Sequence, residues 1–244
     1  KGAFALDSLG GGEVRLDQAV VQVDSRAWQL VRPARVRWDS ASVTLDDVEL
    51  GSLVEGQRSE ADPMRLRAEG TLAWDRDSDL RVTAESVRLD HLFRLAQRED
   101  LSVGGELDLS LRVTGPAQAP VIEGSFDVAE PQYGDLVLTR LQGKLDYKDR
   151  EARVELTAMD GSRSALQAEG TIPVDLALRP VGRRQVSRPM DVRVRADSLR
   201  ASLALSYLTF LEGVQGSVSG DFRIRGDLDR PEPTGVLRLD GAGW

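Results

Sequence analysis

The sequence predicts an all-β fold, an elongated antiparallel sheet built from repeats with few short helices. Three observations predict it: apolar and polar residues alternate along most of the 244 residues, short breaks rich in glycine and aspartate separate the alternating stretches, and parts of the chain repeat one another. Because successive side chains of a strand point to opposite faces, the alternation indicates strands with one dry and one wet face. Antiparallel sheets that are covered on one side show this pattern.

The alternation is clear from residues 34–38 onward and then changes phase. Val43 and Leu45 are odd-numbered, whereas Val48 and Leu50 are even-numbered. We expect a β-bulge or a turn at residues 46–47, because one extra residue re-phases a strand.

Residues 64–75 show the clearest alternation. Their even-numbered side chains are mostly apolar, and we expect the intervening Arg65, Arg67 and Glu69 to face solvent. The same pattern predicts strands at residues 80–85, 107–114, 144–148, 152–158, 174–178, 192–197 and 218–225.

The breaks between strands are short and fit hairpin loops. They lie at residues 10–12, 75–79, 148–151 and 160–162. Helical spacing is limited to residues 89–95, with room for one or two turns, and to the outer ends of residues 199–211. We expect the apolar residues 203–211 to cap the sheet and cover a groove, with contact to a membrane or an acyl chain as the alternative.

The chain contains an internal repeat. Residues 105–115 align with residues 216–226, and residues 66–72 with 166–172. The spacing indicates a repeat of about 100–110 residues. We expect an N-terminal partial repeat at 1–60, a repeat unit at 61–190 and a truncated repeat at 191–244, in a continuous array that is a fragment of a larger protein.

Residues 179–189 interrupt this repeat as an insertion with four arginines and three prolines. We interpret the insertion as a solvated loop between strands. A contact with an anionic lipid or with a partner is the alternative.

The composition removes several classes of function. The chain has no cysteine, one histidine and a formal net charge of -8. It therefore lacks disulfides, thiolate nucleophiles and the ligands of a Cys-ligated or His-rich metal site. An acidic chain also lacks the basic face that nucleic-acid binding requires, so we expect no nucleic-acid partner. No apolar run approaches the roughly 18 residues of a membrane span.

Two features that suggest chemistry have simpler interpretations. Any Ser-His-Asp triad would have to use His91, which lies in a helical or loop patch typical of a solvated surface. The aspartates of residues 75–79 have the spacing of the first three ligands of a calcium-binding loop. The later positions differ, because Leu80 stands where glycine is needed and Ser86 where glutamate is needed. We interpret residues 75–79 as a hairpin tip, and we expect no enzyme, no catalytic residue, no cofactor and no metal.

A sheet with one apolar face must cover that face. Either two sheets fold onto each other in a closed sandwich, or one sheet curls around a ligand. Aromatic residues are only 5% of the chain, and an aliphatic face favours acyl chains over a sandwich core. The residues predicted to line this face are Leu66, Leu72, Trp74, Leu107, Leu109, Leu111, Val113, Val154, Leu156, Val218, Phe222 and Ile224.

Several stretches resemble the repeats of the TamB/AsmA-like family. They are residues 103–128 (VGGELDLSLRVTGPAQAPVIEGSFDV), 133–147 (YGDLVLTRLQGKLDY) and 161–172 (GSRSALQAEGTI), and residues 214–239 repeat the first of them. Residues 28–50 are similar to the proline, strand, dipeptide turn and strand units of the same proteins. The order and spacing of these stretches carry the resemblance, which touches most of the chain.

The resemblance implies a curved, taco-like sheet with a hydrophobic groove and no catalytic residues. It implies a protein of the periplasm of diderm bacteria, anchored in the inner membrane by a segment outside this chain. Such a protein carries phospholipid between the inner and outer membranes and has a role in outer-membrane protein assembly. The implied partners are phospholipid acyl chains and an outer-membrane assembly-barrel protein. A closed β-sandwich that serves as a scaffold for protein secretion or assembly is the alternative.

Overall fold

The computed structural model describes residues 2–6, 10–23, 26–54, 57–58, 64–95, 102–134, 136–182, 184–200 and 215–243. Strands hold 73% of the residues and helix 3%, which confirms the predicted all-β class. The elements of the described residues are β1 Gly2–Leu6, β2 Gly12–Leu16, β3 Val20–Val23, β4 Arg26–Leu30, β5 Ala34–Trp38, β6 Ser42–Val54, β7 Gln57–Arg58, β8 Arg65–Ala73, β9 Ser78–Arg88, α1 Leu89–Leu95, β10 Val103–Gly115, β11 Val121–Tyr133, β12 Leu136–Val137, β13 Arg140–Lys148, β14 Glu151–Asp160, β15 Arg163–Pro173, β16 Met190–Arg200, β17 Gln215–Asp227 and β18 Arg230–Gly243.

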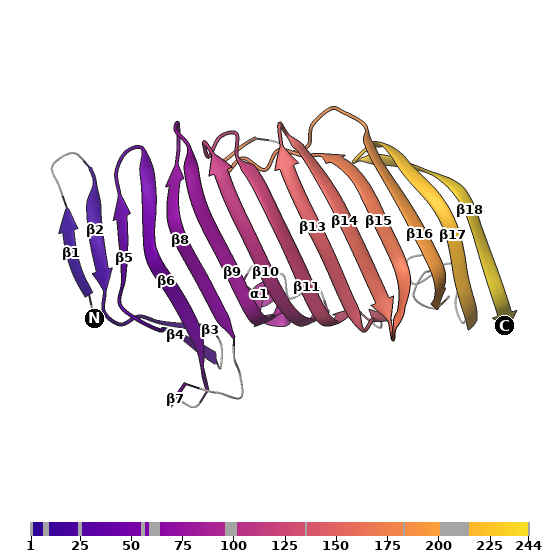
Figure 1. Cartoon of the computed structure of the whole chain (residues 1–244), viewed down its shortest axis with the longest axis horizontal. Coiled ribbons are helices and arrows are strands. Elements are labelled where there is room, and N and C mark those ends of the chain that lie inside the picture. Colours follow the sequence, from indigo (N-terminus) through magenta and orange to yellow (C-terminus); the bar gives the residue numbers. More distant parts are fainter. Residues whose placement is uncertain are drawn as a thin grey trace.

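These strands form one open, curved antiparallel sheet that is not closed into a barrel. The main run of paired neighbours is β1, β2, β5, β6, β8, β9, β10, β11, β13, β14, β15, β16, β17 and β18. β4 pairs with β6, and β3 pairs with β4. β7 pairs with β6, and β12 pairs with β11. Figure 1 shows the strands side by side in a single layer, from indigo at the N-terminus to yellow at the C-terminus. Among the described residues the strands therefore do not build a closed sandwich.

Tight turns join strands where the sequence predicts breaks. Residues 74–77 connect β8 to β9, and residues 161–162 connect β14 to β15. Asp149 and Arg150 connect β13 to β14 with φ values of 54° and 60°. Positive φ at both positions of a two-residue loop fits a type I′ turn, whose twist matches that of the paired strands.

The predicted bulge in β6 is confirmed. The register against β8 shifts between Leu45 and Val48, and Asp47 has a φ of 55°. The bulge absorbs one residue of β6, so the apolar side chains before and after it share one face of the sheet.

The internal repeat is visible in the strand registers. Leu111 opposes Gly124 between β10 and β11, and the aligned Phe222 opposes Gly235 between β17 and β18. The aligned sequences therefore form equivalent hairpins in the same register. The division of the chain at residues 60 and 190 stays a prediction.

The ends of these two hairpins differ. Gly115 and Gly226 both have positive φ, at 71° and 90°. After Gly226 the pairing continues to Asp227 and Arg230, whereas residues 116–120 form a wider loop between β10 and β11.

The predicted strand at residues 174–178 is wrong. Val174 makes only an isolated bridge to Gln185, and the chain leaves the sheet after Pro173. The alternation there has another cause: Val174 and Leu176 pack onto a buried cluster of the sheet.

The helical patch at residues 89–95 is confirmed as α1. The interpretation of His91 as a solvated surface residue is wrong, because its side chain is only 13% exposed and lies 3.6 Å from the Asp90 carboxylate. Residues 203–211, predicted to cap the sheet, lie outside the described residues.

Candidate functional site

The apolar side chains gather on one side of the sheet, which we call the apolar face. In the middle of the sheet Leu109 opposes Phe126, Phe126 opposes Gly143, and Gly143 opposes Leu156. Directly opposed residues of antiparallel strands point to the same side. The row continues through Ala168, Val194 and Phe222.

The registers place most of the predicted lining residues on this face. Trp74 differs, since it lies in the turn after β8 and donates its backbone N–H to the Ala41 carbonyl at 2.8 Å. The predicted residues that share the apolar face are Leu66, Leu72, Leu107, Leu109, Leu111, Val113, Val154, Leu156, Val218, Phe222 and Ile224.

Two glycines leave space on the apolar face for large side chains of the neighbouring strands. A Cβ at Gly143 would stand 2.4 Å from the Phe126 ring, and one at Gly124 would stand 2.3 Å from Leu111 Cδ2. The Phe126 and Leu111 side chains therefore lie across the neighbouring strand, in the space that the glycines leave open.

Loops line one margin of the apolar face. We call it the upper margin after its position in Figure 1. Three backbone hydrogen bonds of 2.8 Å link these loops. Trp74 N–H donates to the Ala41 carbonyl, Ala117 N–H to the Ala73 carbonyl, and Leu178 N–H to the Ala117 carbonyl. The loops that follow β5, β8, β10 and β15 are thus tied to one another along this margin.

The connection between β15 and β16 adds a cover to this margin, and we call its described residues, 174–182 and 184–189, the strap. Its Val174 and Leu176 pack against a buried cluster at the upper ends of β10, β11, β13 and β14. The buried cluster consists of Val113, Ile122, Tyr147 and Ala152.

Hydrogen bonds hold the strap in shape and against the sheet. Leu176 N–H donates to the Tyr147 hydroxyl at 2.9 Å. Asp175 N–H donates to the Arg184 carbonyl at 2.7 Å, and Arg184 Nη1 donates to the carbonyls of Asp175 and Ala177 at 2.9 and 3.0 Å.

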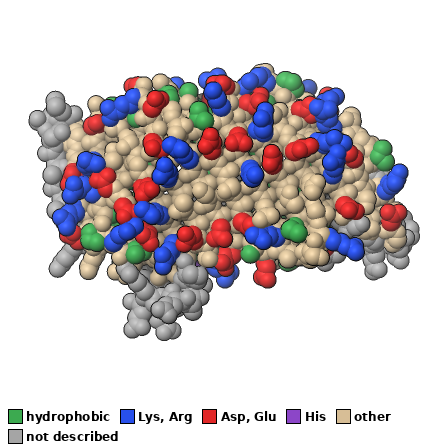
Figure 2. Space-filling model, viewed as in Figure 1, with side chains coloured by type: hydrophobic (Ala, Val, Ile, Leu, Met, Phe, Trp, Pro, Cys, Tyr) green, Lys and Arg blue, Asp and Glu red, His purple; other side chains and the backbone are tan. Residues whose placement is uncertain are grey.

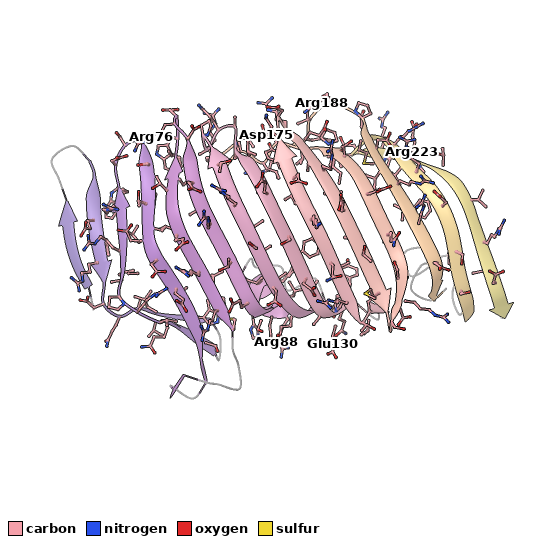
Figure 3. All side chains as sticks on the ribbon, viewed as in Figure 1. Arg76, Arg88, Glu130, Asp175, Arg188 and Arg223 are labelled. Carbon is pink, nitrogen blue, oxygen red and sulfur yellow. The ribbon has the colours of Figure 1, made fainter. Side chains whose placement is uncertain are left out.

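Ion pairing fastens the strap to the turn between β13 and β14. The buried Asp175 carboxylate lies 3.3 Å from Arg150 Nε. Arg188 Nη2 donates to the Asp149 and Arg150 carbonyls at 2.8 and 2.9 Å. Figure 3 shows Asp175 and Arg188 at the upper margin. The segment predicted as a solvated loop therefore has an arginine, Arg188, that fixes it to the sheet.

At the lower margin α1 lies against the apolar face. Its Leu92 packs with Leu66 and Leu109 on a second buried cluster. That cluster consists of Trp28, Met64, Ala84 and Val87.

Between these margins a strip of the apolar face is only half-buried. We call it the central strip, and it consists of Phe126, Leu156, Ala168 and Phe222. None of the four belongs to either buried cluster of the described residues. Val113 and Val218, in contrast, are 5% and 2% exposed, so these two predicted lining residues lie in packed parts of the chain.

The opposite face, which we call the charged face, is covered with Arg, Lys, Asp and Glu side chains, as Figure 2 shows. On β16 and β17, Arg193 Nη2 donates to Asp221 at 2.7 Å, and Arg223 pairs with Asp191. On β11 and β13, Arg140 Nη2 donates to the Asp127 carboxylate at 2.6 Å.

These ion pairs lower the pKa of two carboxyl groups on the charged face. Hydrogen bonds from Arg193 hold the pKa of Asp221 below its ordinary value, and those from Arg223 do the same for the pKa of Asp191. The cause is that an arginine favours the ionised carboxylate. Paired and exposed side chains of this kind keep the face in contact with water.

A shallow depression of about 610 Å³ crosses β9, β10, β11, β13 and β14. Its lining includes the small hydroxyl side chains of Thr83, Ser110 and Ser125 beside Lys144 and Glu155, which lie on the charged face. Short side chains leave this space between longer charged ones, so the depression lies on the charged face and not on the apolar face.

Among the described residues, no group of three or more His, Asp or Glu side chains is placed to hold a metal ion. In the same residues no helix has the length and apolar character needed to cross a membrane.

A sheet with one long apolar face, two covered margins and an internal repeat agrees with a comparison of the sequence with known families. The family model of the TamB C-terminal domain matches residues 57–243. The chain belongs to the TamB family. The match spans β7 to β18 and so contains the strap and the central strip. TamB proteins are envelope-associated and known for transport and assembly rather than catalysis. No curated protein and no solved structure matches the chain.

Sequence reasoning missed the strap as part of this TamB site. The available signal was the insertion in the repeat, which marks residues that the sheet itself does not need. What the spacing could not reveal is that Tyr147, far away in sequence, holds the strap through the backbone of Leu176.

Proposed function

We propose that the central strip binds phospholipid acyl chains, and that this TamB segment conducts lipid between the inner and outer membranes. The observation that carries the proposal is that an apolar row runs across the sheet while its side chains, apart from the buried Val194, stay half-buried. Removing apolar surface from water contributes about 25 cal/mol of favourable free energy per Å². An acyl chain can supply that cover without needing a hydrogen bond.

The remainder of the proposal follows from the family. We place the segment in the periplasm of a diderm bacterium, in a protein anchored in the inner membrane by a segment outside this chain. An outer-membrane assembly-barrel protein is the proposed protein partner, and outer-membrane protein assembly the linked process. Neither role requires a catalytic residue.

Site-specific photocrosslinking in cells tests the proposal. A photoreactive residue at Leu156 should capture phospholipid, because this side chain lies on the central strip. The matched control is Glu155, which precedes it on β14 and opposes Lys144 on the charged face. Equal capture at both positions, or no capture at Leu156 in a folded protein, would contradict lipid binding by the strip.

A further inference from the structure

We infer that the strap closes the upper part of the apolar face to lipid and confines acyl chains to the central strip. The identity of the excluded ligand rests on the proposed function. The closure itself is a property of the fold and can be tested without lipid.

The strap is an addition to the repeat. β8 ends at Ala73 and β15 ends at the aligned Pro173, while β9 begins at Ser78 and β16 at the aligned Met190. Between these equivalent ends the first copy has only the turn of residues 74–77, whereas the second has residues 174–189. A short turn is enough to pair β8 with β9, so the longer connection is not needed to pair β15 with β16.

The added segment folds onto the apolar face. Ile122, Tyr147 and Ala152 under it are 7%, 3% and 5% exposed, whereas Phe126 and Leu156 on the central strip are half-buried. Val174 and Leu176 thus occupy the positions above the sheet that an acyl chain would otherwise take. Because protein interiors are close-packed, the strap and an acyl chain cannot share this surface.

The fastening spans the whole covered region. Leu178 is bonded to Ala117 in the loop between β10 and β11, and Leu176 to the Tyr147 hydroxyl on β13. Asp175 pairs with Arg150 in the turn before β14. The strap is therefore held at successive points across β10 to β14, as a cover must be.

Thiol labelling tests the closure. The chain has no cysteine, so one introduced cysteine is the only thiol to react. In the intact chain, a water-soluble maleimide should label the Leu156→Cys variant at least about tenfold faster than the Ile122→Cys variant, because a buried thiol reacts only after local opening. Replacing residues 174–189 with the sequence of residues 74–77 should raise the labelling rate of Ile122→Cys to that of Leu156→Cys.

A pair of point variants keeps the test decisive if the shortened chain does not fold. Leu176→Asp removes a contact with the buried cluster, whereas Leu178→Asp changes a strap residue that is 40% exposed. Only Leu176→Asp should speed the labelling of Ile122→Cys. The closure is overturned if Ile122→Cys labels as fast as Leu156→Cys in the intact chain, or if both aspartate variants have the same effect.

Lipid capture then separates the two proposals. A photocrosslinker at Ile122 should capture phospholipid only in the shortened chain, and one at Leu156 should capture it in both chains. Capture at Ile122 in the intact chain that equals capture at Leu156 overturns the confinement. Slow labelling of Ile122→Cys without any lipid capture at Leu156 would leave the closure standing and refute the lipid ligand.

Discussion

Gly143 shows how one missing side-chain atom shapes the apolar face. A Cβ there would stand 2.4 Å from Cε1 and Cζ of Phe126, so Gly143→Val must displace the ring. Overpacking of this kind typically costs about 1–3 kcal/mol. We expect the free energy of unfolding of the Gly143→Val variant, measured in urea, to fall by that amount.

Gly182 offers the matched control, because a Cβ at this position would meet nothing within 4 Å. Gly182→Val should change the free energy of unfolding by no more than about 0.5 kcal/mol. Equal losses in the two variants would show that the Phe126 ring does not depend on the space above Gly143.

Asp221 gives the charged face a pH dependence with a defined sign. Its folded-state pKa is lowered, chiefly by the hydrogen bond from Arg193. Such a carboxyl adds stability above its unfolded pKa of about 3.9, and that stability is lost as the pH falls through the lower folded value. The melting temperature of wild type should exceed that of Asp221→Asn at pH 7, and the difference should shrink below about pH 4.

Asp227 serves as the control for this measurement, since it makes no ion pair with a described residue. The Asp227→Asn variant should melt close to wild type at every pH. A gap between wild type and Asp221→Asn that widens on acidification would refute the assigned role of the Arg193 pair.

At the scale of elements, the bulge in β6 decides which face Val48 and Leu50 join. Deleting Asp47 removes the extra residue, and a one-residue shift turns every following side chain to the other face. We expect the deletion to abolish the pairing of the second half of β6, with faster proteolysis and a lower strand signal in circular dichroism.

Asp47→Gly is the control for the deletion, because glycine adopts the positive φ of this position without strain. It also removes the exposed ion pairs with Arg32 and Arg67, which add little stability. The register argument fails if Asp47→Gly disrupts β6 as much as the deletion does.

Local patterns explain why most strands could be predicted and the strap could not. β5 and the bulge at Asp47 follow from alternation within a few residues. The alternation at residues 174–178 has the same appearance, but its packing depends on Tyr147 and Ala117, which no local pattern connects to it. Short-range alternation reports which side chains are covered, not which element covers them.

At the scale of the whole molecule, the same limit applies to the candidate site. Val113 and Leu156 both belong to alternating stretches, and the registers place both on the apolar face. Their surroundings differ because the strap covers the upper ends of β10 to β14. Which part of the face is packed and which is half-buried therefore depends on tertiary structure.

A pair of aspartate substitutions measures this difference. An unpaired carboxylate at the 5% exposed Val113 has no access to water, so Val113→Asp should lower the free energy of unfolding by about 3 kcal/mol or more. Water can reach a carboxylate on the half-buried central strip, so Leu156→Asp should cost only about 1–2 kcal/mol.

Phospholipid capture by a photocrosslinker at Phe126, the neighbour of Leu156 across Gly143, should nevertheless fall in Leu156→Asp, because a charge now faces the acyl chain. Glu155→Gln on the charged face should change neither stability nor capture. Equal destabilisation by Val113→Asp and Leu156→Asp would show that the strip is packed core, and lipid conduction along it would then have to be abandoned.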